Sequence, residues 1–584
     1  MNKILLILIT CAGLQLTCPI PVCARDNATR QTQVEPKKAY KAVLNVITYK
    51  ADGSVLRSGY GFYISEDGTG VAPYSLFEDA ARAEVFDFAG KRSAVTRILG
   101  ANSTYDLVTF QTAAEKKCEY FDPAQTATPA VGATLYLRKY TTDKKDPTAK
   151  ANVTKADAYG KYKYYHISAE NTAPNMGCPL FNEDGALVGI VQPNVEDSAT
   201  EACAIDARFV PTLSISATSA LNSDLRAIHI PKALPSNAKD ALTYIYMLGN
   251  ADSTELATAL NDFIATFPEK VEGYVQRATF FANHRLYDQC EADFAEALTR
   301  AEAEDATMKA DEVHNEFSKI IFQKAVYSPQ PPYKDWTLDR ALAEAEQAFS
   351  LNPSPNYLLQ QGRCLFSKKD FQKAYEKFYQ ICSSPQFDAG WSPTAQAETW
   401  YYAAQSLELA GGDSLQVLAM MDSVINNLPT PLTPATAQYL LERARRLEKA
   451  GQYRKAVFDY NQYETVVGPK NLNAYFYFIR EQAELKAHMY QQALDDIRTA
   501  AILSPEDPNY KIEEALILLQ TGLYKEAIAA CKKLLQTVPE NPDCYKIIGI
   551  ANGELGNKQE ALSALNKAKS LGDPTVDQFL EKYK

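Results

Sequence analysis

The chain of 584 residues lacks an excess of positive charge and, after its first residues, lacks any long apolar run. It has 60 Lys and Arg residues against 71 Asp and Glu residues, a net charge of −11, so we do not expect nucleic acid or an anionic membrane surface as its main partner. No internal stretch is long and apolar enough to predict a membrane span. With 46% hydrophobic and 22% charged residues, the composition is that of a globular protein.

Cysteine is scarce and is not arranged in metal-binding or redox motifs. Eight cysteines follow the first 24 residues, with no C-x-x-C pair among them, which excludes a small disulfide scaffold and gives no zinc or thioredoxin-like motif. Cys178 and Cys203 lie near two expected strands and are the pair that an oxidising compartment would let bridge. Gly59-Tyr60-Gly61 lacks the third glycine and the following helix of a dinucleotide fingerprint. We therefore expect no cofactor and no metal.

The first residues have the layout of a secretory signal peptide. Lys3 precedes an apolar run from Ile4 to Leu16, and Val22-Cys23-Ala24 offers small residues before a cut. We expect a signal peptide at 1–24 and a linker at 25–37, and hence an exported protein, periplasmic or extracellular, of a bacterial envelope. A lipoprotein is the alternative, but the residues before Cys11, Cys18 and Cys23 fit it poorly.

Residues 38–222 have the patterns of an all-β domain. Short β-branched and aromatic segments alternate with turn signals such as Asp52-Gly53 and Asp67-Gly68. Many short strands in so few residues favour a closed or sandwiched β domain. The expected strands are 43–49, 60–65, 84–88, 107–111, 134–140, 161–168, 187–191 and 202–210.

After a linker at 223–236 the hydrophobic period changes to that of helices, and a repeat is present from 237 to 584. Ala456, Ala493, Ala527 and Ala561 each follow a short turn, and they are 37, 34 and 34 residues apart. This pattern resembles the tetratricopeptide repeat, TPR, and implies an all-α solenoid of about eight helix pairs. In such a solenoid the small residues let paired helices approach closely. Pro329-Gln330-Pro331-Pro332 interrupts one unit as an inserted loop.

Four segments of the β half together resemble the trypsin-like serine proteases in their bacterial, HtrA-like form. Their order and spacing match the family's glycine-rich strand, histidine segment, aspartate strand and serine segment. The resemblance implies a double β-barrel, so the expected fold is multidomain: a trypsin-like double barrel followed by the TPR solenoid. The four segments are 58–68, 71–80, 105–110 and 174–190.

The resemblance assigns the catalytic positions, and most of them hold unsuitable residues. Ser75 stands at the histidine position and cannot exchange a proton near neutral pH as imidazole does. Met176 stands at the nucleophile position and has no proton to lose. Asp106 remains at the aspartate position. Pro174 occupies an oxyanion position and has no N–H, and loss of one such donor costs on the order of 10²–10³ in rate. We therefore expect a pseudoprotease with no catalytic residues.

Other residues of the β half have ordinary structural interpretations. We interpret His166 as a satisfied or half-exposed strand histidine, and a nucleophilic role for Cys178 is disfavoured. The tyrosine-rich strand around Tyr162 is either a half-buried sheet face or a peptide-binding edge.

Three functions follow from this reading. The first is an exported scaffold that binds proteins or peptides through the TPR groove. The second is an active peptidase with a non-standard catalytic set, and the third is an envelope assembly or maintenance factor. The sequence leaves the partner and the oligomeric state open.

Overall fold

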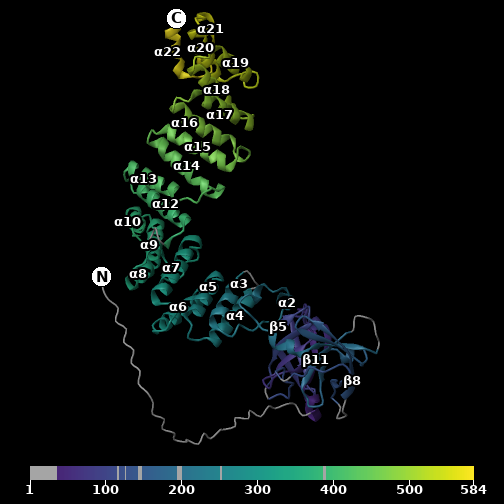
Figure 1. The fold of residues 1–584 in the computed structure, drawn as a ribbon. Coiled ribbons are helices and arrows are strands. Elements are labelled where there is room, and N and C mark those ends of the chain that lie inside the picture. Colours follow the sequence, from purple (N-terminus) through teal and green to yellow (C-terminus); the bar gives the residue numbers. More distant parts are fainter. Residues whose placement is uncertain are drawn as a thin grey trace, which may run out of the picture. The chain divides into compact units, whose positions relative to one another are not determined.

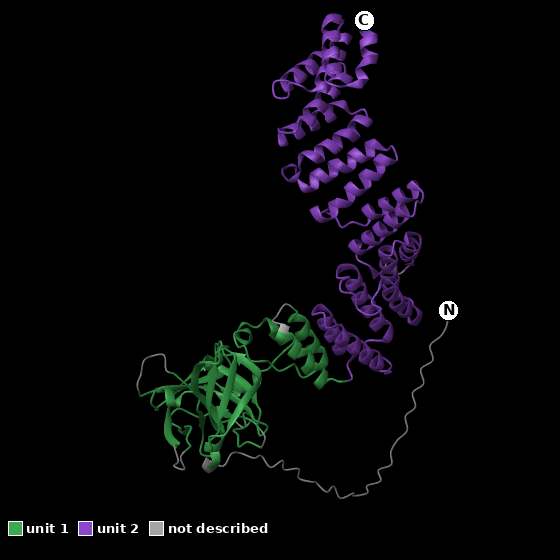
Figure 2. Cartoon of the chain, turned by 180° about the vertical axis from the view of Figure 1, so that it is seen from behind, with its two compact units in different colours: residues 1–268 green, residues 269–584 purple. Residues whose placement is uncertain are grey.

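The structure is a computed structural model that describes residues 36–114, 117–124, 126–142, 148–193, 200–249, 253–385 and 390–584. The expected signal peptide at 1–24 lies outside the described residues, as does the expected linker up to residue 35. The chain divides into two compact units, residues 1–268 and 269–584 (Figure 2). Figure 1 shows strands in the first unit and helices through the second.

Two closed six-stranded antiparallel barrels form most of the first unit, which confirms the expected double barrel. The first barrel has the strand order β1-β2-β3-β6-β5-β4 and the second the order β10-β11-β12-β9-β8-β7. The strands of the first are β1 Val43–Tyr49, β2 Val55–Tyr63, β3 Thr69–Ala72, β4 Arg82–Phe86, β5 Arg92–Asn102 and β6 Leu107–Thr112. Those of the second are β7 Thr134–Arg138, β8 Thr148–Tyr159, β9 Tyr162–Ile167, β10 Pro179–Phe181, β11 Leu187–Gln192 and β12 Ala202–Asp206.

The strand predictions differ from the structure in two respects. Strands β3, β5, β8 and β10 were not expected, because β3 and β10 are very short and β8 is rich in Lys and Ala. The strand expected over 202–210 ends at Asp206. There the Asp206 carboxylate accepts a hydrogen bond from the backbone N–H of Arg208, 3.0 Å away, and starts a 3₁₀ turn at Ala207–Thr212.

The first unit also contains helices α1 Tyr74–Phe77, α2 Ser223–Arg226, α3 Ala238–Met247 and α4 Ser253–Thr266. Strand β5 holds α4 through Arg97, whose Nε and Nη2 donate to the two carboxylate oxygens of Asp262 at 2.9 and 2.8 Å. A second link joins Lys232 Nζ to Glu255 Oε1 at 3.0 Å. These ion pairs attach the first helices of the expected solenoid to the β domain.

The second unit is a series of antiparallel helix pairs. In its described residues each helix packs on the next in pairs α5·α6, α7·α8, α9·α10, α12·α13, α14·α15, α16·α17, α18·α19 and α20·α21, and α22 Asp577–Tyr583 follows. The first helices of these pairs are α5 Val271–Asn283, α7 Ala310–Tyr327, α9 Pro355–Ser367, α12 Pro393–Leu409, α14 Pro434–Lys449, α16 Ala474–Lys486, α18 Pro508–Gln520 and α20 Pro542–Glu554. The second helices are α6 Tyr287–Ala301, α8 Leu338–Leu351, α10 Phe371–Cys382, α13 Ser414–Asn426, α15 Tyr453–Val467, α17 Tyr490–Leu503, α19 Tyr524–Leu534 and α21 Lys558–Ser570.

Small residues bring the helices of each pair together, as the repeat predicts. The four regularly spaced alanines Ala456, Ala493, Ala527 and Ala561 are fully buried. A Cβ added at Gly362 would lie 2.6 Å from the Phe378 ring of the partner helix. The close approach of the two helices therefore requires a residue without a side chain at that position.

Three helix pairs each contain an equivalent Arg–Asp ion pair, which the sequence analysis did not predict. An arginine of the first helix donates to an aspartate sixteen residues later on the second helix. Both partners of Arg480–Asp496 are buried, and Arg480 Nε lies 2.6 Å from Asp496 Oδ2. The others are Arg277–Asp293 and Arg443–Asp459.

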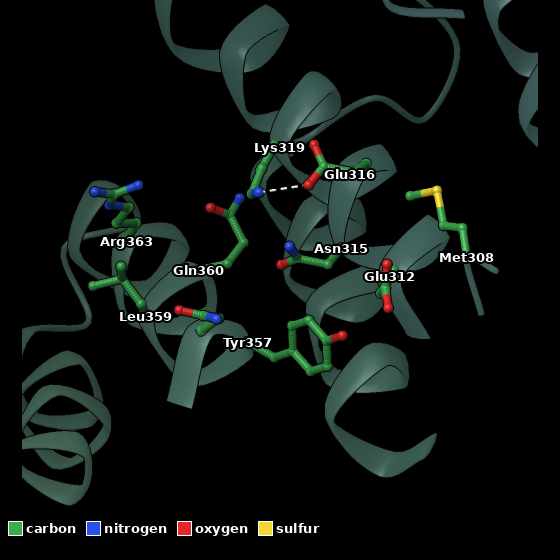
Figure 3. Close-up of a pocket in the computed structure, with 10 residues that line it drawn as sticks. Met308, Glu312, Asn315, Glu316, Lys319, Tyr357, Leu359, Gln360 and Arg363 are labelled. Carbon is green, nitrogen blue, oxygen red and sulfur yellow. Dashed lines mark hydrogen bonds and ion pairs between the residues drawn. The ribbon is translucent and has the colours of Figure 1, made fainter. Parts of the chain in front are cut away.

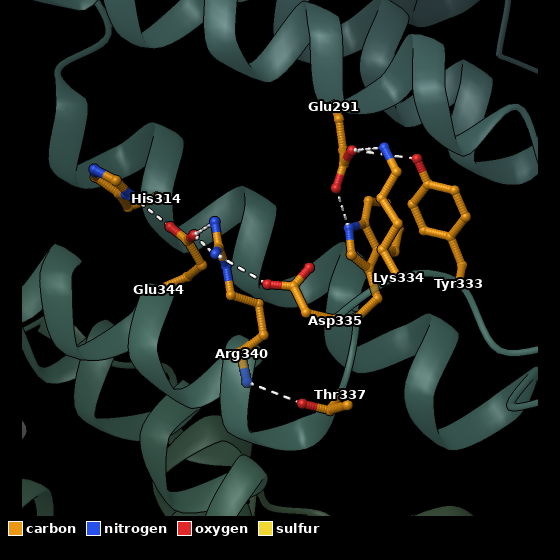
Figure 4. A network of polar contacts seen from close by, with 9 residues as sticks. Glu291, His314, Tyr333, Lys334, Asp335, Thr337, Arg340 and Glu344 are labelled. Atoms are coloured by element: carbon orange, nitrogen blue, oxygen red, sulfur yellow. Dashed lines mark hydrogen bonds and ion pairs between the residues drawn. The ribbon is translucent and has the colours of Figure 1, made fainter.

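The inserted proline-rich loop, which lies between α7 and α8 in the chain, is held against α6 (Figure 4). Glu291 on α6 accepts hydrogen bonds from Trp336 Nε1 at 2.7 Å, Lys334 Nζ at 2.5 Å and the Tyr333 hydroxyl at 3.2 Å. The Trp336 side chain is buried and packs against Tyr287. Asp288 Oδ1 also accepts from the Tyr333 hydroxyl at 2.8 Å and pairs with Lys334 Nζ at 2.9 Å, so two carboxylates of α6 fix the end of the insertion that leads into α8.

Candidate functional site

The three triad positions come from short segments between strands. Ser75 lies in the single-turn helix α1, which follows β3, and Asp106 lies in the turn between β5 and β6 with a positive φ of 49°. Met176 ends the 3₁₀ turn Ala173–Asn175, just before β10. The first barrel thus supplies two of the positions and the second barrel the third.

Ser75 and Asp106 are in direct contact. The Ser75 backbone N–H donates to Asp106 Oδ1 at 2.7 Å, and its hydroxyl donates to Oδ2 at 3.3 Å. Burial raises the pKa of Asp106, and these two hydrogen bonds oppose the rise. The carboxylate thus orients a hydroxyl where the family would orient an imidazole. A hydroxyl cannot serve as a general base near neutral pH.

The nucleophile position is filled by a packing residue. The half-buried Met176 side chain lies against the core of the second barrel, together with Tyr60. The next residue, Gly177, has a φ of +78°, and a Cβ there would lie 2.0 Å from the Tyr60 carbonyl oxygen and 2.8 Å from Pro73 Cδ. The serine segment is therefore packed against β2 and against the residue before α1.

Neither backbone donor of the oxyanion position is available. Pro174 has no N–H, and the N–H of Met176 donates to the Ala173 carbonyl at 3.2 Å within the 3₁₀ turn. The buried Asn175 side chain supports this turn by donating from Nδ2 to the Glu170 carbonyl at 2.6 Å. A developing negative charge at this place would find no backbone N–H from either residue.

Cys178 and Cys203 do not form the disulfide that the sequence allowed. Both are buried free thiols. Cys178 belongs to the core of the second barrel together with Ala202 and Ala204. Side chains alternate along a strand, so Cys203 points to the other face of β12. Burial raises the pKa of the Cys178 thiol to about 12, which makes it a poor nucleophile.

His166 is buried rather than half-exposed, and both of its ring nitrogens face polar side chains. Nε2 lies 3.1 Å from Asp157 Oδ2, and Nδ1 lies 3.8 Å from Cys203 Sγ. Sequence reasoning missed this group because its members are distant along the chain. Only the register of β8, β9 and β12, in which Cys203 stands opposite His166, brings them together.

The idea of a peptide-binding edge at the tyrosine-rich strand is wrong. Strand β9 pairs with β8 on one side and with β12 on the other, so it offers no open edge.

Two further observations concern the described residues only. They contain no group of three or more His, Cys, Asp or Glu side chains placed to hold a metal ion. None of their helices combines the length and the apolar character needed to cross a membrane.

A second candidate site is a cavity of about 530 Å³ between α7 and α9, the first helices of consecutive pairs (Figure 3). Amide and charged side chains line it. Asn315 is 5% exposed, and its Oδ1 is buried without a hydrogen-bond partner. Lys319 Nζ pairs with Glu316 Oε1 at 2.6 Å, as the dashed line in Figure 3 marks, and Arg363 lies on the opposite helix.

The cavity has an acidic end at Glu312. Burial raises the pKa of Glu312, and the nearby carboxylates of Asp311, Glu272 and Glu316 raise it further. The cavity can therefore accept hydrogen bonds at Asn315 and attract a positive charge at Glu312.

Comparisons with known proteins agree with this architecture. Residues 59–190 match the family model described as a trypsin-like peptidase domain, and residues 482–542 match a tetratricopeptide-repeat model. A similar solved structure is the crystal structure of the MamO protease domain from Magnetospirillum magneticum in its apo form. It is 16% identical, with a TM-score of 0.26, and the match covers 30% of this chain and 96% of that one. No curated protein matches the chain. The chain thus carries a trypsin-like peptidase domain followed by a tetratricopeptide-repeat domain.

Proposed function

We propose that the chain is an exported scaffold whose peptidase-like domain does not cleave peptides and whose TPR domain binds them. The observation that carries the first part is the state of the oxyanion position: Pro174 has no N–H, and the Met176 N–H is bonded to Ala173. In addition, Ser75 replaces the general base and Met176 replaces the nucleophile. Export rests on the apolar leader at 1–24.

The cavity between α7 and α9 supports the binding part. An extended peptide presents backbone N–H groups along its length, and the unpartnered Asn315 Oδ1 is an acceptor for one of them. Glu312 lies among other carboxylates, so a basic side chain next to it would relieve their repulsion. The proposed ligand is therefore an extended peptide with a lysine or arginine.

Binding of a peptide library to the full chain tests the second part. We expect enrichment of peptides that contain lysine or arginine. Glu312→Gln should weaken their binding about fivefold to tenfold, which corresponds to about 1–1.4 kcal/mol. The matched control is Glu346→Gln, an exposed glutamate in α8, which should leave binding unchanged. Equal binding of basic and acidic peptides, or equal loss in both variants, contradicts the proposed ligand.

Cleavage is measured on the same samples. Casein and the peptide library are incubated with the full chain and analysed by mass spectrometry. We expect no new termini above those of a buffer control. Specific cleavage would overturn the first part of the proposal and leave the binding result to be judged separately.

A further inference from the structure

The outer face of the second barrel carries a group of side chains that the degenerate triad does not include. Three neighbouring strands contribute one member each: Cys203 on β12, His166 on β9 and Asp157 on β8. His166 lies between the other two, with Nδ1 3.8 Å from the Cys203 sulfur and Nε2 3.1 Å from Asp157 Oδ2. A nucleophile next to a base that a third group orients is the arrangement that activates a side chain for attack.

Each member has the environment its role requires. Asp157 is the most exposed of the three, and Lys155 Nζ, 2.8 Å away, together with His166 lowers its pKa, so it stays charged and holds the ring. Glu201 Oε2 lies 4.0 Å from His166 Nδ1, which adds a second negative charge beside the imidazole. The imidazole therefore has a carboxylate near each of its ring nitrogens.

The cysteine itself is close to a further hydroxyl. Burial is the main reason that the pKa of Tyr164 is raised, and the charge of Cys203 and a hydrogen bond to Cys203 raise it further. The Tyr164 hydroxyl therefore stays protonated and donates toward the sulfur. Cys203 is 1% exposed, while the side chain of Asp157 is 43% exposed, so the group is open to solvent at its carboxylate end. At 1% exposure the sulfur is out of reach of a peptide carbonyl, so any reactant must be not much larger than water.

We propose that Cys203 is a base-assisted thiol that reacts with small hydroperoxides, with His166 as the base and Asp157 as its positioning residue. His166 takes the thiol proton, and the thiolate sulfur attacks one peroxide oxygen. The S–O bond forms as the O–O bond breaks, and the leaving hydroxide takes the proton from His166 to become water. Sulfur loses two electrons and peroxide gains them, so the thiol and hydrogen peroxide become a sulfenic acid and water.

Two other cysteines in the first unit serve as internal references. Cys178, the other cysteine of the second barrel, has its thiol pKa raised to about 12 by burial and points to the opposite face of the sheet. Cys118 is more exposed than Cys203, and burial together with nearby carboxylates raises its pKa. On exposure alone Cys118 would react fastest, whereas the proposal makes Cys203 the fastest of the three.

The experiment treats the full chain with hydrogen peroxide, traps sulfenic acid with dimedone and measures the modification of each cysteine by mass spectrometry. We expect Cys203 to react about tenfold faster than Cys118. His166→Gln should lower the Cys203 rate about tenfold or more and leave the Cys118 rate unchanged. His229→Gln, a change of an exposed histidine in the same unit, is the matched control and should change neither rate.

The pH profile separates a positioning role for Asp157 from a merely structural one. A lone thiol loses about tenfold in rate for each pH unit below its pKa, whereas a thiol beside a base loses less. Within the part of the chain that the structure describes, the titratable groups facing the pair are Lys155, Asp157, Tyr164 and Glu201. Asp157→Asn should steepen the fall between pH 8 and pH 6 while circular dichroism and the Cys118 rate stay those of the wild type.

Three results would overturn the proposal. The first is a Cys203 rate no higher than that of Cys118. The second is a rate that His166→Gln leaves unchanged. The third is a pH profile of the Cys203 rate that Asp157→Asn leaves unchanged, since Asp157 would then not position the base.

Discussion

Replacement of Glu481 by glutamine is expected to stabilise the second unit at alkaline pH. Glu481 stands on α16 where the neighbouring pairs have the small residues Ala444 and Ala515, 37 residues before and 34 after. Its side chain is fully buried, and Oε1 has no hydrogen-bond partner. Glu484, one turn later, is also buried and has an unpartnered Oε2. The helix pair therefore holds two buried carboxyl groups, and that of Glu481 stands where the neighbouring pairs have a methyl group.

Burial is the main reason that the pKa of Glu481 is raised to about 8, and the charges of Glu513 and Asp496 add to it. Burial likewise raises the pKa of Glu484 to about 8. The folded chain then holds more protons than the unfolded chain, in which a glutamate titrates near 4.3. Stability therefore falls as pH rises from about 4.5 to about 8 and is constant above that range.

The size of the effect follows from the shift. One pKa unit corresponds to about 1.4 kcal/mol, so the full shift sets an upper bound near 5 kcal/mol for Glu481 alone. Because local relaxation and water entry reduce this cost, we expect Glu481→Gln to gain about 2–4 kcal/mol over the wild type between pH 5 and pH 8. With a urea slope of about 3 kcal/mol per molar, the midpoint should shift by about 1 M.

Urea unfolding followed by circular dichroism at 222 nm at pH 5, 6.5 and 8 measures this gain. Glu346→Gln is the matched control, because Glu346 is exposed in the middle of α8. It should show no pH-dependent gain. A Glu481→Gln midpoint that follows the wild type at all three pH values, or an equal shift in both variants, would refute the reasoning.

Three further changes test the packing of the second unit. Asp496→Ala leaves the buried Arg480 without the carboxylate that accepts two of its hydrogen bonds and should lower the free energy of unfolding by about 3–5 kcal/mol; an unchanged urea midpoint would contradict the ion pair. Glu291→Ala removes the acceptor of Trp336 and leaves Asp288 as the carboxylate that holds Lys334 and Tyr333, so trypsin should cut at Lys334 about tenfold faster; an unchanged rate would show that Glu291 does not hold the loop. Gly549→Val places a Cβ 2.6 Å from the Leu565 side chain and should cost about 1–3 kcal/mol, visible as a lower Tm; a Tm at or above the wild-type value argues against the close helix approach.

The architecture could be predicted from the sequence because it depends on local patterns. Turn dipeptides and alternating strands indicated the β domain, and alanines at a fixed interval indicated the helix pairs, since both signals lie within a few residues of one another. The family resemblance placed Ser75 and Asp106 at triad positions, and the structure adds that the two are in contact.

What sequence reasoning missed depends on contacts between distant residues. Cys203 and His166 are 37 residues apart and meet only because β12 pairs with β9 in one register. Glu481 was overlooked because a carboxylate is not expected at a small-residue position, although the repeat interval leads to it. The hydrogen bond from the Met176 N–H to the Ala173 carbonyl depends on one 3₁₀ turn, and no residue pattern in the sequence predicts that turn.

The most direct test of the central claim is labelling of the purified full chain with a fluorophosphonate probe for serine hydrolases. The probe requires an activated hydroxyl and an oxyanion site, and the structure offers Met176 at the nucleophile position and Pro174 at the oxyanion position. We predict no labelling above that of heat-denatured protein. Robust labelling of the native chain that persists in a Ser75→Ala, Met176→Ala double variant would contradict the account, because it would require an active serine elsewhere in the fold.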